Sequence, residues 1–143
     1  MRDPISLKDC IARYAPNLDP KTHKKILTDL ETELASITLR PHLGSLWHHL
    51  KAYNYKIAIC SNLAEAYGET LTENLPFAPD ALILSYETGS IKPEAEIYQS
   101  VCEALNLSPS EIFFTGTHNQ PMWTVLKPLE CRQVSLILSL NFF

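Results

Sequence analysis

Hydrophobic residues in the first 40 positions recur with the spacing of amphipathic helices. Leu7, Ile11 and Tyr14 fall on one face of an expected first helix. A second helix is expected to open at NLDPKT, where Asp19 can cap and Pro20 takes the first helical position. The whole segment is therefore predicted to be helical. The apolar stripe of the second helix consists of Ile26, Leu27, Leu30, Leu34 and Ile37.

From Pro41 onward the pattern changes to a short amphipathic helix and then to brief apolar runs. Helical segments such as EAEIYQSVCEAL (94–105) separate these runs. Strands that alternate with helices indicate a parallel sheet covered on both faces, with ligands bound at the carboxyl ends of the strands. We therefore divide the chain into a helical segment, 1–40, and an α/β unit, 41–143. The predicted strands are KIAIC (56–60), ALILS (81–85), IFFT (112–115) and VSLIL (134–138).

Composition restricts the classes of protein that this pattern fits. The 143 residues are 45% hydrophobic and 20% charged, which is typical of one domain with a sizeable core. A net charge of −4 and the lack of a basic stripe argue against nucleic-acid binding. No stretch has the length of a membrane span, and MRDPISLKD lacks the apolar core of a signal peptide. GxGxxG and GxSxG are also absent, which disfavours a dinucleotide-binding domain and a serine hydrolase.

The cysteines favour a reducing compartment. They show no CxxC spacing, so a disulfide framework or a zinc site is not expected. We interpret them as structural thiols and expect a cytoplasmic protein. The four residues are Cys10, Cys60, Cys102 and Cys131.

Two strand ends carry side chains suited to an anion. Ser61 and Asn62 follow KIAIC and offer a hydroxyl, an amide and backbone N–H groups. The alternative is that both residues cap a helix beginning near LAEAYG. Lys92 precedes Pro93, which is predicted to occupy the first turn of a helix. Its ammonium can point at a phosphate near the strand ends, or it is an ordinary solvated lysine.

The third strand end reads FFTGTHNQ. Gly116 provides the tight turn after IFFT, and Thr117, His118 and Asn119 follow it. A lone histidine in a polar loop, without two further metal-ligand residues nearby, is typical of solvent exposure rather than metal binding.

The order of these three ends resembles the haloacid dehalogenase (HAD) superfamily of phosphohydrolases. YKIAICSNLA resembles the family's second motif, whose serine or threonine binds the phosphoryl group. SYETGSIKPEAEIY resembles the third, whose lysine neutralises charge, and SPSEIFFTG resembles the run into the fourth. The resemblance runs from about Leu39 to Leu138 and implies a Rossmann-like parallel sheet. Residues 1–40 look like the tail of the family's α-helical cap.

The chain departs from the family pattern at both places where acids are needed. No DxDx(T/V) nucleophile strand occurs, and Gly116-Thr117 stands where the fourth motif has Gly-Asp. Thr117, His118 and Asn119 are neutral at pH 7 and would hold the family's Mg²⁺ poorly. We therefore expect a truncated, degenerate member with a remnant phosphate corner at Ser61, Asn62 and Lys92. It would lack efficient phosphatase activity by itself and would bind no cofactor.

The missing first strand creates a second expectation. In the family it lies between the second and fourth strands, so its loss would leave KIAIC and IFFT with unpaired edges. The two strands would then pair directly, accept a strand from another chain, or make the protein prone to associate. The apolar end LILSLNFF fits a truncated product or a tail buried against a partner.

Two alternatives stay open at this point. One is an active Mg²⁺-dependent phosphohydrolase completed by another chain, with His118 and Asn119 taking over part of metal binding. The other is a non-catalytic binding protein that uses the vacant strand slot or the phosphate corner. The expected partners are a phosphate or phosphorylated small molecule, a second copy, or a strand-donating protein.

Overall fold

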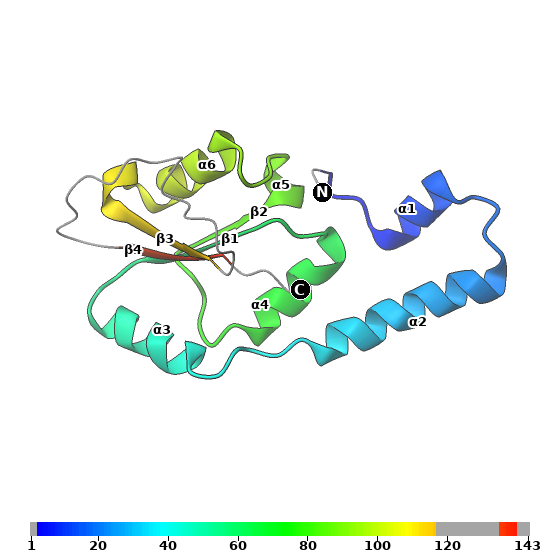
Figure 1. Ribbon diagram of the computed structural model, residues 1–143, viewed down its shortest axis with the longest axis horizontal. Helices are drawn as coiled ribbons and strands as arrows, with labels where there is room; N and C mark the ends of the chain where they lie inside the picture. Colours follow the sequence, from blue (N-terminus) through cyan, green and yellow to red (C-terminus); the bar gives the residue numbers. More distant parts are fainter. Residues whose placement is uncertain (1–2, 117–134, 140–143) are drawn as a thin grey trace.

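The computed structural model describes residues 3–116 and 135–139, which form a parallel sheet with helices on both faces (Figure 1). Neighbouring strands are parallel throughout, in the order β2-β1-β4-β3. The predicted parallel α/β architecture is confirmed. The strands are β1 (Ile57–Ser61), β2 (Ala81–Leu84), β3 (Ile112–Gly116) and β4 (Ser135–Ser139).

Helices connect and flank these strands. The α-helices are α1 (Leu7–Tyr14), α2 (Pro20–Ser36), α3 (Leu43–Ala52), α4 (Gly68–Asn74), α5 (Ser85–Thr88) and α6 (Ala95–Leu105). Two 3₁₀ turns, η1 (Glu65–Tyr67) and η2 (Pro109–Glu111), precede α4 and β3.

Strand β1 is buried on both faces, which explains its unbroken apolar sequence. Ala58 and Cys60 belong to the hydrophobic cluster that α6 covers, whereas Ile57 and Ile59 belong to the cluster beneath α3 and α4. Burying a side chain the size of isoleucine contributes about 1.5–3 kcal/mol, so this one strand anchors both halves of the core. The α6 residues in the first cluster are Ile97, Tyr98, Val101 and Leu105; the second cluster includes Trp47, Leu63, Leu71 and Leu84.

Strand β4 lies between β1 and β3, where the family resemblance implied a missing strand. Ile137 is opposite Ala58 on one side and opposite Phe114 on the other. The expectation that the facing edges of these two strands would be unpaired is therefore wrong. Buried backbone N–H and C=O groups require partners, and the chain's own residues 135–139 supply them.

Several element boundaries differ from the sequence expectations. The third helix begins at Leu43 rather than at Pro41, after His42 adopts a left-handed φ of 68°. The strand predicted to end at Ser85 ends one residue earlier. Pro93 follows a cis peptide bond and precedes α6 instead of occupying its first turn. A hydrogen bond of 2.8 Å from the Glu94 N–H to the Ile91 carbonyl closes a turn around the proline.

The helical arm, defined as α1 and α2, lies beside the sheet and covers neither face (Figure 1). Asp19 caps α2 as expected, because its carboxylate accepts the N–H groups of Lys21 and Thr22. Neither arm helix contains a buried residue, in contrast to α6. The assignment of the arm to a cap segment remains a prediction.

The described residues bear on two further expectations. Within them, no helix has both the length and the hydropathy to cross a membrane. Cys10, Cys60 and Cys102 carry free thiols, and Cys131 lies outside the described residues. A cytoplasmic location stays a prediction.

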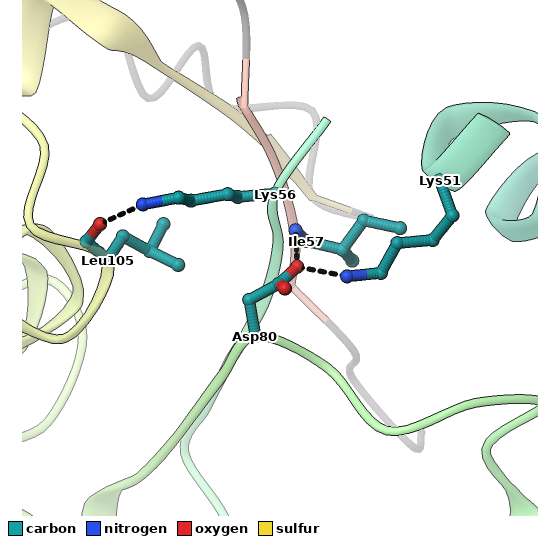
Figure 2. Close-up of polar contacts among 5 residues, drawn as sticks. All are labelled: Lys51, Lys56, Ile57, Asp80 and Leu105. Carbon is teal, nitrogen blue, oxygen red and sulfur yellow. Dashed lines mark hydrogen bonds and ion pairs between the residues drawn. The ribbon is translucent and has the colours of Figure 1, made fainter. Parts of the chain in front are cut away.

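A polar clamp fixes the amino end of β1 (Figure 2). The Asp80 N–H donates to the Ile57 carbonyl at 2.7 Å, and the Asp80 carboxylate accepts the Ile57 N–H at 2.6 Å. The same carboxylate pairs with Lys51, while the Lys56 ammonium donates to the Leu105 carbonyl at 2.6 Å. Burial acts to raise the pKa of Asp80, but the bonds from Lys51 and Ile57, with the charges of Lys51 and Lys56, outweigh it and lower the pKa.

We predict that Asp80→Asn lowers the free energy of unfolding by about 1 kcal/mol at pH 7, because an ionic acceptor becomes a neutral one. A lowered folded-state pKa adds stability above the unfolded value near 3.8, and this is lost as pH falls through the folded value. The difference from wild type should therefore shrink below about pH 4 in urea titrations. Asp29→Asn, which breaks the exposed Lys25–Asp29 pair, is the control and should change stability by less than about 0.5 kcal/mol. A difference that persists unchanged at pH 3 would contradict this assignment.

Candidate anion site at the carboxyl edge of the sheet

The carboxyl ends of the four parallel strands meet at one edge of the sheet. Ser61 is in register with Leu84 at the end of β2, and Gly116 is in register with Ser139 at the end of β4. In open α/β sheets this edge is where ligands bind.

The predicted site residues Asn62 and Lys92, which are 30 positions apart, meet at this edge. The Lys92 N–H donates to Asn62 Oδ1 at 2.7 Å, and Asn62 Nδ2 donates to the Lys92 carbonyl at 3.0 Å. Both ends of the Asn62 amide are thus engaged with the backbone of Lys92. Asn62 holds the lysine segment against the end of β1, so its role here is to position Lys92.

The Lys92 side chain reaches the end of β1. Its Nζ donates to the carbonyl of Cys60 at 3.1 Å. Cys60 is the residue directly before Ser61. Burial lowers the pKa of Lys92, and the electrostatic interaction with Cys60 acts in the opposite direction. Burial also raises the pKa of Cys60 to about 11, against the charge of Lys92. The thiol is therefore protonated near pH 7 and is a poor nucleophile.

Ser61 is the last residue of β1 and is 1% exposed. The alternative that Ser61 and Asn62 cap the following helix is wrong. The N-cap of η1 is Ala64 and that of α4 is Tyr67, and neither makes a side-chain capping bond.

Ser85 is a site residue that sequence analysis did not single out. Its side chain is fully buried. Its Oγ accepts a hydrogen bond from the Leu63 N–H at 3.0 Å, and the hydroxyl donates one to the Leu63 carbonyl at 3.2 Å. It thus ties the end of β2 to the loop that follows β1. A polar residue directly after a buried strand was the available signal, the same one that identified Ser61.

The third predicted strand end is only partly described. Gly116 is the last residue of β3, at the same edge as Ser61. Thr117, His118 and Asn119 lie outside the described residues.

The described part of the edge does not fit Mg²⁺. This cation requires carboxylates or other oxygen ligands in near-octahedral geometry. Within residues 3–116 and 135–139, no three histidine, cysteine, aspartate or glutamate residues form a group able to hold a metal. The side chains assembled here are hydroxyls, one amide and one ammonium, a set that suits an anion.

Comparison with known protein families gives one match over most of the chain. A family model described as haloacid dehalogenase-like hydrolase matches residues 11–116, which is 106 of the 143 residues. The matched region contains Ser61, Asn62 and Lys92 and ends with β3, so β4 lies outside it. No solved structure matches the chain.

We predict that Ser85→Ala destabilises the protein by about 1–3 kcal/mol, because it leaves the Leu63 N–H and carbonyl without their buried partner. Chemical denaturation followed by tryptophan fluorescence measures the change. Ser100→Ala removes an exposed hydroxyl bonded to the Glu96 carbonyl and should stay within about 0.5 kcal/mol of wild type. Equal effects of the two substitutions would show that Ser85 has no special role in joining the two strand ends.

Proposed function

The chain belongs to the haloacid dehalogenase-like hydrolase family, and from this we propose that it retains the family's phosphate corner but has no efficient phosphatase activity by itself. The corner consists of Ser61, Asn62 and Lys92. Its ligand is inorganic phosphate or the phosphoryl group of a small molecule, bound weakly.

One observation carries the anion-binding part of the proposal. The Asn62 amide clamps the backbone of Lys92, and the partly buried ammonium lies at the end of β1. Ligands bind at the carboxyl edge of open α/β sheets, and titratable groups with a shifted pKa, such as Lys92, concentrate at binding sites. An anion at this edge would interact favourably with the ammonium. Backbone N–H groups after Ser61 would add hydrogen bonds to its oxygens.

The lack of acids supports the inactive part of the proposal. Family-type phosphoryl transfer uses a carboxylate nucleophile on the central strand. In this chain the central position next to β1 is taken by β4, with the sequence SLILS, which contains no acid. Loss of a catalytic nucleophile alone typically reduces kcat by several orders of magnitude.

The alternative of an enzyme completed by another chain meets a physical obstacle. A donated nucleophile strand would have to displace β4, which pairs on both sides with strands of its own chain. The incoming strand would gain only the backbone bonds that β4 gives up. A binding protein that uses a vacant strand slot meets the same obstacle.

We predict no phosphatase turnover above the uncatalysed background for the chain alone. The measurement is phosphate release from a panel of phosphomonoesters, with Mg²⁺ and with a chelator. Turnover that requires Mg²⁺ and disappears in Lys92→Ala would overturn the proposed inactivity and favour the alternative of a live hydrolase.

We further predict that phosphate stabilises the wild-type protein and that Lys92→Met abolishes this effect. A ligand at ten times its Kd adds about 1.4 kcal/mol, which thermal denaturation detects as a shift of a few degrees. Lys56→Met is the matched control, since Lys56 also donates to a backbone carbonyl but lies at the amino end of β1. It should lower stability while preserving the phosphate shift. An equal phosphate shift in all three proteins would contradict the proposed site.

A further inference from the structure

The apolar stripe of α2 is only partly buried by the residues that the structure describes. We define the arm stripe as Ile26, Leu27, Leu30, Leu34 and Ile37. All five are partly exposed, and α2 contains no buried residue although it is the longest helix in the described part of the chain. The shorter α6 buries four residues of its stripe against the sheet. The arm projects beside the sheet, so the sheet cannot cover the stripe (Figure 1).

Charge is distributed along α2 in two opposite halves. Its beginning carries Lys21, Lys24 and Lys25, and its second half carries Asp29, Glu31 and Glu33. This order opposes the helix dipole, which favours acids near the beginning of a helix and bases near its end. The first turn has no acidic residue and the last turn has no basic one.

Two of these charges, Lys24 and Glu31, flank the arm stripe on the side away from Glu33. Lys24, Leu27, Glu31 and Leu34 recur at the spacing of one helix face. Lys24 and Glu31 are exposed, and neither forms an ion pair with any residue the structure describes. Glu33 lies on the opposite flank, where its carboxylate bonds to Tyr67 of η1; burial, this bond and the charge of Glu33 together raise the pKa of Tyr67.

We propose that α2 is a self-association surface whose occupant is α2 of a second copy in antiparallel orientation. If Leu27 faces Leu30 of the second copy, Lys24 of each chain comes within about 3 Å, along the helix axis, of the level of Glu31 of the other. The two dipoles then run in opposite directions, and the basic half of each helix faces the acidic half of its partner. A parallel arrangement would place like charges together.

This geometry makes a symmetric contact from one set of residues. A two-fold axis near the middle of α2 repeats the Lys24–Glu31 pair along one flank of the shared stripe, once on each side of the axis. The contact is small, below the roughly 1,200 Å² of a standard interface, so we expect a weak dimer with a Kd of about 10–100 µM. The proposal does not depend on anion binding, because its residues are those of α2 and none of them belongs to the phosphate corner, although the arm lies on the side toward which the strands' carboxyl ends point (Figure 1).

The test is sedimentation equilibrium of the full chain from about 10 µM to about 1 mM, compared with two single charge reversals. We expect a monomer–dimer equilibrium for wild type, weakened by high salt. Lys24→Glu and Glu31→Lys should each raise the Kd at least tenfold, because each places like charges opposite one another. The double variant Lys24→Glu/Glu31→Lys should regain the wild-type Kd.

An equimolar mixture of the two single variants gives the sharpest test. One variant then offers two acids where the other offers two lysines, so a heterodimer should form although neither variant pairs well with itself. The control is Glu73→Lys, which reverses the charge of an exposed residue on α4 and should dimerise like wild type. A monomer at every concentration overturns the proposal. So does a dimer indifferent to both reversals, or a mixture no more associated than its components, since each outcome places the contact elsewhere or removes it.

Discussion

The pairing of β4 with both β1 and β3 is the constraint on which the rest of the structure depends. Without β4, the buried groups of β1 and β3 would face each other across a gap, and each unpaired group would cost free energy comparable to a lost hydrogen bond. With β4 in register with Ala58 on one side and Phe114 on the other, β1 and β3 belong to one continuous sheet. The family match ends at the last residue of β3. The strand that completes the sheet is therefore outside the region that identifies the family.

The same placement determines what the carboxyl edge can do. The carboxyl end of β4 lies next to the end of β1, where the Lys92 ammonium donates to the Cys60 carbonyl. In a sheet able to transfer phosphoryl groups, a carboxylate would have to arrive there. The sequence of β4, SLILS, has no carboxylate to place there. The completion of the sheet and the proposed loss of catalysis thus have one physical cause, the identity of the central strand.

Sequence pattern predicted most elements because their signals are local. The cap at Asp19, the apolar run of β1 and the periodicity of α6 each depend on near neighbours. The position of β4 did not follow, because VSLIL is apolar enough for any buried slot and strand order depends on pairing between distant segments. The Asn62–Lys92 clamp spans 30 positions, so the sequence suggested two separate anion ligands where the structure has one residue positioning the other.

Stability and binding place opposite demands on the carboxyl edge. Burial lowers the pKa of Lys92, which means that its charged form is less favourable there than in water. Nevertheless two hydrogen bonds of Asn62, and one that the Leu63 N–H donates to Ser85, hold the segments of this corner together. At the amino edge, by contrast, Lys51 forms an ion pair with Asp80 and Lys56 donates to the Leu105 carbonyl. Both interactions stabilise the start of β1. A lysine at the amino edge is explained by the fold alone. The Lys92 ammonium instead bonds to the Cys60 carbonyl at the carboxyl edge, where the proposed anion site lies.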